Sequence, residues 1–441
     1  MKASFLKTIL MLTALAVNLA DASSDTSIYQ SVLKDEPRLF ELFKRLHQNP
    51  ELSFMEFETA SLVAEELGAN GFEVTTGIAT TGVVGVMKNG DGPVVLFRAD
   101  MDGLPIKEET DLPYKSTAQK QDRFGINRPT MHACGHDAHT TWLIGMARQL
   151  NEQRDHWSGT AVLLAQPAEE IIEGAKAMIA DGLYDTIPQP DIIISAHTIP
   201  LIPAGVMAIR EGRRMAGTDQ IDVLIRGVGG HGSTPHATKD PVMMGVMAVQ
   251  GYQTIVSRML DQSQPAVLTV GAFEAGDTNN IIPEEATLKV NLRWYSPQER
   301  KQLIDGIKAI TDNVAEMYGV PASRMPEYDM KGYAIPVINE NADDVEKARR
   351  AMADTLGEAR VVNGLPPIMG SEDFQMLAEP FAGTRILFVE VGSGKPDVYD
   401  NLVQKGEYPP LNHTPRYVVE RPAIATGTAA LTSIVMDFLA D

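Results

Sequence analysis

Short, continuous runs of apolar residues, many of them β-branched, alternate along this chain with segments of helical periodicity. The runs cover residues 94–97, 161–165 and 192–194. Strands that are apolar on both sides are typical of a mostly parallel sheet with helices packed on it. Apolar side chains recur at helical spacing within 39–46, 60–67, 143–150 and 431–438. We therefore expect an α/β domain in which helices cover a mostly parallel sheet.

Residues 216–327 show a different pattern. Apolar and polar side chains alternate along 221–225 and again along 288–294, which predicts strands with one polar face. With helical stretches near 241–260 and 297–318, the order is strand, helix, strand, strand, helix, strand. That order predicts a small α+β sandwich of the ferredoxin-like type, inserted into the larger domain. The predicted bounds are 23–215 and 328–441 for the discontinuous larger domain and 216–327 for the insertion.

The charge of the chain excludes two classes of partner. The 58 acidic residues outnumber the 38 basic ones, and the formal net charge is −20. Nucleic acids and anionic membranes both favour positively charged proteins. We therefore expect neither as a partner. The single cysteine cannot form a disulfide within the chain.

The N-terminus has the three parts of a secretory signal peptide. Two lysines form a basic start, residues 9–17 are mostly apolar, and residues 20–22 read Ala-Asp-Ala, which fits a cleavage site. The apolar run is shorter than the ~20 residues that span a bilayer. We expect cleavage of segment 1–22 and a secreted or periplasmic protein that is not attached to a membrane; an uncleaved anchor is the alternative. In an oxidising compartment a lone cysteine is expected to be buried or bound, which draws attention to Cys134.

Charged or imidazole side chains follow directly after each predicted buried strand. Asp100 and Asp102 follow the first strand, Glu169 and Glu170 follow the second, and His197 follows the third. In open α/β sheets, ligands bind at the carboxyl ends of the strands. We therefore expect these side chains to converge at one edge of the sheet.

A fourth segment, residues 131–137, carries Cys134 and His136 to the start of a predicted helix. Residues two apart in an extended loop can face one point, and a helix N-terminus favours the thiolate. Thiolate, imidazole and carboxylate together suit zinc or manganese. Taken singly, Cys134 is more simply a small apolar core residue and His197 a hydrogen-bonded core histidine, so the metal site rests on the combination. Structural roles are expected for His132, His139 and His156, with His139 a candidate to orient a ligand.

Nine short motifs occur in a fixed order over nearly all of the chain. They are LHQNPEL (46–52), RADMDGLP (98–105), MHACGHD (131–137), QPAEE (166–170), AH (196–197), GHGSTPH (230–236), NNIIP (279–283), GSEDF (370–374) and NHTP (412–415). In these motifs the chain resembles the amidohydrolase branch of the aminoacylase- and carboxypeptidase-like metallopeptidases. That branch contains hippurate hydrolases, N-acyl-amino-acid amidohydrolases and hydrolases of indole-acetyl amino acids.

The resemblance implies a site for two divalent metal ions per subunit, zinc or manganese, with nickel as a third option. The implied ligands are Cys134, His136, Glu170, His197 and His413. Cys134 is implied to take a bridging place between the ions. Glu169 is implied to be the general acid/base, and Asp100 to orient a ligand.

The resemblance also implies that the inserted domain is a lid that mediates dimerisation, so that the protein forms a homodimer or a larger homo-oligomer. His231 is implied to reach the substrate carbonyl, often from the partner subunit. Asn280 and Arg293 are implied to hold the substrate carboxylate, and Gly370 to contact the substrate. The alternation independently places Arg293 on the face opposite the apolar side chains, where a solvated strand face is the alternative. Trp294 departs from the family, which commonly has a smaller residue there, and leaves the packing of the lid open.

The expected reaction is the metal-dependent hydrolysis of an N-acyl amino acid, with an aromatic acyl group, to a carboxylic acid and an amino acid. A metal-activated water attacks the amide, and Glu169 moves the proton. A dipeptidase or metallocarboxypeptidase using the same site is one alternative. A non-catalytic metal-binding or small-molecule-binding protein is another, but Glu169 beside Glu170 argues against it, since binding alone needs no general base.

Overall fold

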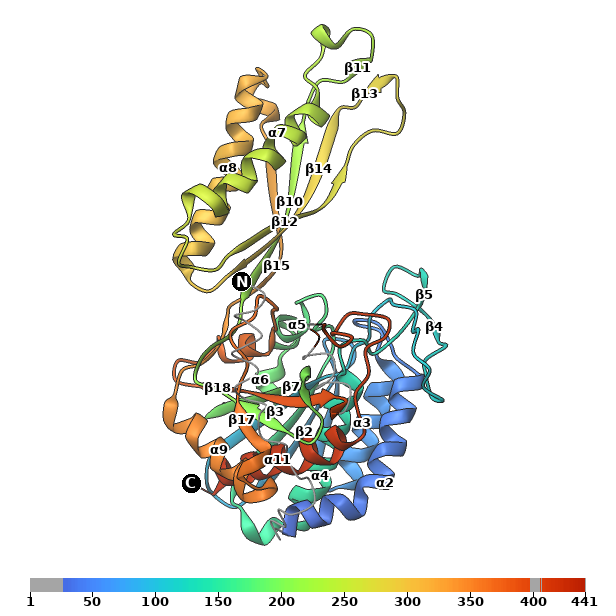
Figure 1. Ribbon diagram of the computed structural model, residues 1–441, viewed down its shortest axis with the longest axis vertical. Helices are drawn as coiled ribbons and strands as arrows, with labels where there is room; N and C mark the ends of the chain where they lie inside the picture. Colours follow the sequence, from blue (N-terminus) through green and yellow to red (C-terminus); the bar gives the residue numbers. More distant parts are fainter. Residues whose placement is uncertain (1–26, 397–404, 406, 441) are drawn as a thin grey trace. The chain divides into compact units, whose positions relative to one another are not determined.

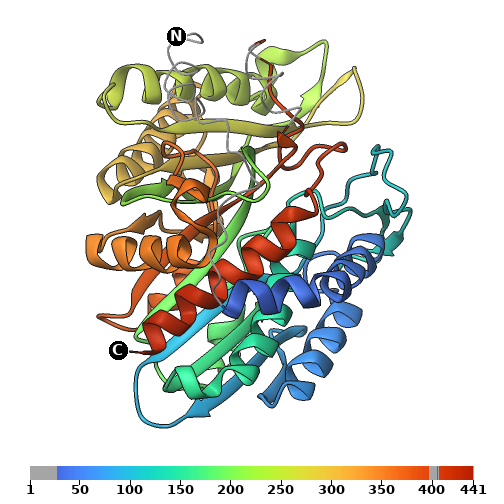
Figure 2. The same ribbon diagram turned by 60° about the horizontal axis from the view of Figure 1, so that its bottom comes forward.

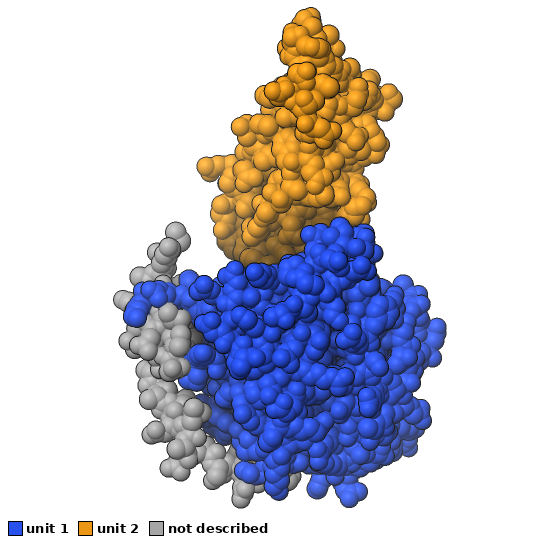
Figure 3. Space-filling view, turned by 90° about the vertical axis from the view of Figure 1, so that its right-hand side faces the viewer, with its two compact units in different colours: residues 1–212, 338–366, 373–441 blue, residues 213–337, 367–372 orange. Residues whose placement is uncertain are grey.

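The structure is a computed structural model that describes residues 27–396, 405 and 407–440, in two compact units (Figure 3). Unit 1 comprises Met1–Gly212, Ile338–Pro366 and Asp373–Asp441, and unit 2 comprises Arg213–Val337 and Pro367–Glu372. The predicted insertion, residues 216–327, falls inside unit 2. No periodicity marks the second segment of unit 2; it joins this unit through the backbone N–H of Ala216, which donates to the carbonyl of Gly370 over 2.8 Å.

An eight-stranded sheet forms the centre of unit 1, in the order β1-β2-β6-β3-β7-β18-β8-β17 (Figure 1). Its four middle strands run parallel to one another; they are β6 (Gly159–Gln166), β3 (Val94–Asp100), β7 (Ile192–Pro203) and β18 (Arg385–Gly394). The flanking strands are β1 (Glu73–Ile78), β2 (Gly82–Asn89), β8 (Met207–Ile209) and β17 (Val361–Asn363). The predicted α/β class with a mostly parallel sheet is confirmed. The three predicted runs lie in β3, β6 and β7, and β6 is buried along its whole length.

Helix α11 (Pro422–Leu439) packs against three other helices of unit 1 (Figure 2). These are α2 (Ser27–Gln48), α4 (His136–Glu152) and α9 (Ala342–Leu356), and α3 (Phe57–Ala69) contacts β1 and β2. By length and composition α11 could cross a membrane, but 83% of it is buried inside the unit. A helix that is apolar all round and enclosed by protein is typical of a core helix.

Shorter elements connect these. They are β4 (Gln119–Gln121), β5 (Asn127–Pro129), η1 (Arg154–His156), α5 (Gly174–Ala180), α6 (Leu183–Thr186), β9 (Gly212–Met215), β16 (Val337–Asn339), η5 (Glu358–Arg360) and η6 (Phe374–Ala378). Strands β4 and β5 form an isolated hairpin, with Lys120 paired to Arg128. This hairpin leaves the sheet and was not expected from periodicity, because three-residue strands are too short to show one.

Unit 2 contains a four-stranded antiparallel sheet in the order β12-β14-β10-β15. Its elements are β10 (Gly217–Arg226), α7 (Pro241–Thr254), β12 (Val267–Glu274), β14 (Glu285–Trp294), α8 (Pro297–Met317) and β15 (Glu327–Ala334). Short pieces add β11 (Gly230–His231), η2 (Pro235–Ala237), η3 (Ile255–Met259), β13 (Ile281–Ile282) and η4 (Ala322–Arg324). The order of strands and helices is the predicted one, so the second fold class, an inserted α+β unit, is confirmed as well.

Local sequence explains how the elements of unit 2 begin and pack. Helix α8 starts with a capping box, in which the Ser296 hydroxyl accepts from the Glu299 N–H and the Glu299 carboxylate accepts from the Ser296 N–H. Trp294, the departure from the family pattern, is buried, and its Nε1–H donates to Asp219 over 2.8 Å. Gly217 makes room for it, since a Cβ there would lie 2.9 Å from the indole ring.

The predicted secreted or periplasmic location is wrong. It depended on residues 1–22, which lie outside the described residues, and no signal peptide is evident in the part of the chain that the structure describes. The first described element is α2, which begins at Ser27 and packs against α4 and α11. The burial of Cys134, which is 7% exposed, follows from its place among other candidate ligands and needs no oxidising compartment.

Candidate metal centre

The five implied metal ligands converge in unit 1, although 279 positions separate the first from the last. Sγ of Cys134 lies 3.3 Å from Nε2 of His197 and 3.3 Å from Nε2 of His413. Oε2 of Glu170 lies 3.3 Å from the same atom of His413. One group of candidate ligand atoms within 4.8 Å of one another joins His136 to Glu169 and Glu170. Two further groups contain Cys134, one with His136 and His197 and the other with Glu170 and His413. Cys134 is the member that the two groups share.

A left-handed glycine sets the direction of the cysteine loop. Gly135 has φ +92° and immediately precedes α4, so the chain turns sharply between Cys134 and His136. A Cβ at Gly135 would lie 2.4 Å from Oγ1 of Thr198. The Thr198 hydroxyl in turn donates to the Cys134 carbonyl over 2.9 Å. Only glycine satisfies both the backbone conformation and this close approach.

Hydrogen bonds fix the tautomers of two histidines. Nδ1 of His136 lies 2.8 Å from the Asp102 carbonyl, and Nδ1 of His197 lies 2.8 Å from the Thr198 carbonyl. A carbonyl can only accept, so each Nδ1 must carry the proton and each neutral ring presents a lone pair at Nε2. Nε2 of His136 is buried and has no hydrogen-bond partner. Imidazole nitrogens and a thiol sulfur that face one another form a donor set that binds zinc or manganese. These residues therefore fit a divalent cation.

The electrostatic environment also favours a cation. Burial lowers the pKa of His136, but Asp100, Asp102 and Glu170 outweigh it and raise that pKa to about 10. The carboxylates therefore create a negative potential strong enough to hold a proton on a fully buried imidazole. A metal ion in the same place would experience the same potential and would displace that proton.

Asp100 acts on the ligands through His139. Its Oδ1 lies 2.6 Å from Nδ1 of His139, and the Thr198 backbone N–H donates to the other ring nitrogen over 3.0 Å. The His139 ring lies 5.3 Å from the ring of His136 and 4.7 Å from that of His197. Burial lowers the pKa of His139 to about 3, so the ring is neutral. His139 therefore packs between two candidate ligands, in the orienting place that the sequence suggested for it.

Asp102 organises the site, a role that its predicted place after the first buried strand did not indicate. Its two carboxylate oxygens accept from the backbone N–H groups of Glu169 and Glu170, over 3.2 and 3.1 Å. Its carbonyl accepts from His136, as described above. Ser53 adds a hydroxyl hydrogen bond of 2.7 Å to the same carboxylate. The only signal was its position at the end of a buried strand, two residues after Asp100.

The two glutamates after β6 lie side by side at the candidate centre. Glu169 and Glu170 both have carboxylate oxygens near Nε2 of His136, at 3.8 and 3.9 Å. Ala168, before them, has φ +54°, which is unusual for a residue with a Cβ. Its N–H donates to Glu56 over 2.9 Å. This strained turn brings both carboxylates to the same place, where their oxygens and His136 form a group of candidate ligand atoms within 4.8 Å of one another.

The predicted substrate-binding residues all lie in unit 2, in two separate places. His231 in β11 pairs with Ile281 of β13, and the Asn280 carbonyl accepts from the Gly232 N–H over 2.8 Å, so His231 and Asn280 are neighbours. Arg293 lies near the other end of β14 and donates to Ser371, the residue after Gly370. Their roles toward a substrate stay predictions.

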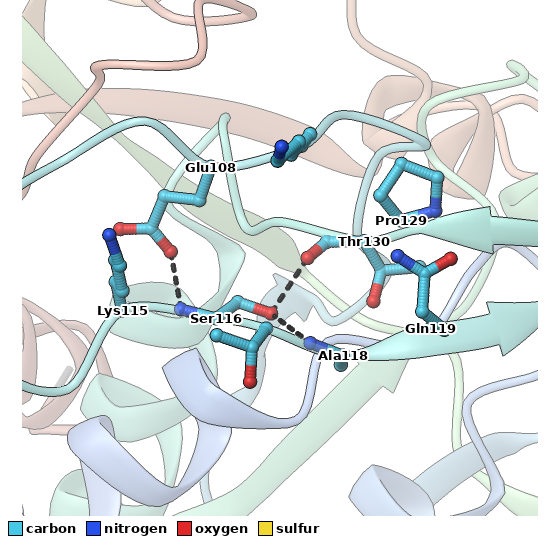
Figure 4. Close-up of a pocket in the computed structure, with 9 residues that line it drawn as sticks. Glu108, Lys115, Ser116, Ala118, Gln119, Pro129 and Thr130 are labelled. Atoms are coloured by element: carbon cyan, nitrogen blue, oxygen red, sulfur yellow. Dashed lines mark hydrogen bonds between the residues drawn. The ribbon is translucent and has the colours of Figure 1, made fainter.

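A surface hollow of about 240 Å³ in unit 1 contains none of the predicted site residues (Figure 4). Ser116 is at its wall, where its N–H donates to Glu108 over 2.5 Å and its hydroxyl to the Thr130 carbonyl over 2.7 Å. Lys107 and Lys115 also line it. We assign the chemistry to the histidine and carboxylate cluster, because neither a histidine nor a cysteine lines the hollow.

The family assignment rests on sequence. The model of Peptidase family M20/M25/M40 matches residues 96–415. The chain belongs to this family. It is a hydrolytic enzyme that acts on amides.

Named relatives agree with the predicted branch. Hippurate hydrolase of Campylobacter jejuni is 38% identical over 76% of this chain and 83% of its own length. The IAA-amino acid hydrolase ILR1-like 2 of Arabidopsis thaliana is 32% identical over 95% of this chain and 90% of its own. A crystal structure of a dinuclear metal-binding peptidase of the M20 family from Bacillus subtilis superimposes with a TM-score of 0.71, at 27% identity, covering 92% of this chain and 99% of that one. The predicted membership of the amidohydrolase branch is confirmed, and a family of dinuclear metal-binding type fits the ligand groups found here.

Proposed function

We propose that this protein hydrolyses the amide bond of N-acyl amino acids with an aromatic acyl group, releasing a carboxylic acid and a free amino acid. One observation carries the proposal: a cysteine, three histidines and a glutamate converge in unit 1 with the carboxylate of Glu169 beside them. The names of two relatives support the substrate class, since hippurate and indole-acetyl amino acids are both aromatic-acyl amino acids.

Two divalent cations, zinc or manganese, when bound to Cys134, His136, Glu170, His197 and His413, supply Lewis-acid activation of water and of the amide carbonyl. Glu169 accepts the proton of the attacking water at its carboxylate and returns it to the leaving nitrogen. Asp102 keeps Glu169 and Glu170 in place through their backbone N–H groups.

The residues of unit 2 bind the ends of the substrate in this proposal. Arg293 holds the α-carboxylate, for which a guanidinium offers two parallel hydrogen bonds. Arg293 donates hydrogen bonds to the side chains of Asn291 and Ser371. His231 donates to the carbonyl oxygen as negative charge develops there.

A substrate panel with and without a chelator tests the function. Purified protein loaded with zinc or manganese is assayed on benzoylglycine, indole-acetyl-alanine, acetylglycine and glycylglycine, with elemental analysis of the same samples. We expect kcat/KM to be highest for the two aromatic-acyl substrates, and all activity to disappear with a chelator and return with metal. Faster cleavage of the free dipeptide would favour the peptidase alternative, and metal binding without turnover of any amide would favour the binding protein.

A further inference from the structure

The β4–β5 hairpin of unit 1 presents large apolar side chains to solvent on an ordered turn. Phe124 is 74% exposed and Ile126 48% exposed. The Asp122 carboxylate closes the turn by accepting from the backbone N–H groups of both, each over 2.9 Å. Single exposed apolar residues are common. Here two of them lie together on one tight turn.

An arginine joins this turn to a second aromatic ring. The Arg123 guanidinium carbon lies 5.1 Å from the centre of the Phe124 ring and 6.0 Å from that of Phe54. Its charge is compensated by Glu173, whose carboxylate lies 2.7 Å from it. We call Phe54, Arg123 and Phe124 the aromatic wall. The aromatic wall therefore combines two aromatic rings with a guanidinium whose charge Glu173 compensates.

Two sets of hydrogen bonds tie the aromatic wall to the Glu169 turn. Glu173 follows this turn directly, and the Ile172 N–H closes it by donating to the Glu169 carbonyl over 2.7 Å. On the other side, the N–H groups of Phe54 and Ala168 donate to the same oxygen of Glu56, over 3.0 and 2.9 Å. Arg123, through Glu173, and Phe54, through Glu56, are therefore both linked to the turn that carries Glu169, the predicted general base.

The backbone at Phe54 is strained. Its φ of +64° lies in the left-handed region, which a bulky residue rarely adopts. Strain of this kind persists where the surrounding structure imposes a particular direction on the chain. Here it accompanies a ring held against Arg123, next to Ser53, whose hydroxyl donates to Asp102.

We propose that the aromatic wall binds the aromatic acyl group of the substrate by stacking. This rests on the proposed function. Aromatic rings and a guanidinium plane both stack on a flat π-system. The charged end of an N-acyl amino acid is a poor fit, because Glu173 neutralises Arg123 and a second carboxylate, Glu58, already binds Lys120 of the hairpin over 3.1 Å. The wall therefore discriminates among acyl groups and leaves the α-carboxylate to other residues.

The test compares Phe124→Ala with the wild type on benzoylglycine and acetylglycine. We expect the ratio of kcat/KM for benzoylglycine to that for acetylglycine to fall by about 3- to 10-fold, mostly through KM, as expected for the loss of one stacking contact. Phe124→Tyr keeps the ring and should keep the ratio. Leu33→Ala, at an exposed position of α2 that is 41% exposed, is the matched control and should change neither rate.

A binding measurement separates this proposal from the proposed function. Calorimetric titration with benzoate and acetate is carried out on the metal-loaded wild type and on Phe124→Ala. Phe124 is 74% exposed, so we expect the variant to fold. Weaker binding of benzoate by the variant, with acetate as the reference, supports the wall even if no amide is cleaved. An unchanged ratio in both assays, or equal losses for benzoyl and acetyl compounds, overturns it while leaving the hydrolase itself intact.

Discussion

At the scale of single residues, a substitution of Glu169 distinguishes a role in catalysis from a role in metal binding. Replacing it by glutamine keeps its size and removes its ability to accept a proton. We expect Glu169→Gln to lose turnover of benzoylglycine by at least about 10²- to 10⁴-fold, the range that general acid–base catalysis supplies. The metal content, measured by elemental analysis, should equal that of the wild type. If metal and activity disappear together, Glu169 is a ligand and the roles of the two glutamates are reversed.

Cys134 belongs to two candidate ligand groups, one with His136 and His197 and one with Glu170 and His413. A serine there is a weaker ligand for zinc and for manganese, so Cys134→Ser should lower the content of both ions. His413 belongs to one group only, and His413→Ala should therefore lose about one ion per subunit and retain the other. Elemental analysis of dialysed proteins measures the two ratios. One ion firmly retained by Cys134→Ser would show that the sulfur is not shared.

The residues of the candidate site that could be predicted from sequence are those whose own side chains carry the chemistry. Cys134, His136 and His197 follow strand ends or precede a helix, and these positions converge in an α/β fold. The position of Asp102 was predicted in this way, but its role was not, and Ser53 was not predicted at all, because these two side chains act on backbone N–H groups or on another carboxylate. Such contacts depend on how two loops are placed relative to each other, and neither loop has a sequence periodicity that would predict this placement.

At the scale of elements, His47 joins the end of α2 to the start of α4. Its ring nitrogens lie 2.6 Å from Asp137 and 3.2 Å from Glu108. Burial lowers the pKa of His47, but these two carboxylates raise it above 6.5 to about 9. The folded protein therefore holds an extra proton between these pH values. This contribution to stability is complete below about pH 6.5 and is lost as the pH rises through 9.

His47→Gln removes that charge and leaves two buried carboxylates without a cation. We expect the free energy of unfolding to fall by about 3 kcal/mol at pH 6, the lower end of the range for breaking a buried ion pair. The difference from the wild type should shrink as the pH rises from 6.5 to 9, as measured by urea titrations at several pH values. A difference that stays constant over this range would show that His47 is neutral in the folded protein.

The elements themselves were predictable where one face or both faces are buried. Continuous apolar runs mark β3, β6 and β7, and alternation marks β10 and β14. The order of strands in the sheet was not predictable, because it depends on long-range pairing such as Val94 with Thr160. The same is true of the β4–β5 hairpin, whose tip is apolar and exposed, against the usual pattern of a polar turn.

At the scale of the whole molecule, the two pairs of predicted substrate-binding residues lie at opposite ends of β14. His231 and Asn280 belong to β11, β13 and their loops, which extend beyond the end of β14 that starts at Glu285 (Figure 1). Arg293 lies near the other end. At about 3.3 Å per residue, Glu285 and Arg293 are about 26 Å apart. An N-acyl amino acid is much shorter than this distance, which is the separation expected if His231 reaches the substrate from a partner subunit, as the resemblance implies.

Mixing two inactive variants tests this arrangement. His231→Ala and Arg293→Ala should each lose most activity on benzoylglycine as homodimers, since every site lacks one group. In dimers formed from an equal mixture, half of the molecules combine both variants, and each of these has one intact site. Unfolding and refolding the mixture should therefore restore about a quarter of the wild-type activity, with light scattering confirming that dimers have formed. Activity that stays at the level of the separate variants would mean that each site is built within one chain, and that His231 or Arg293 has another role.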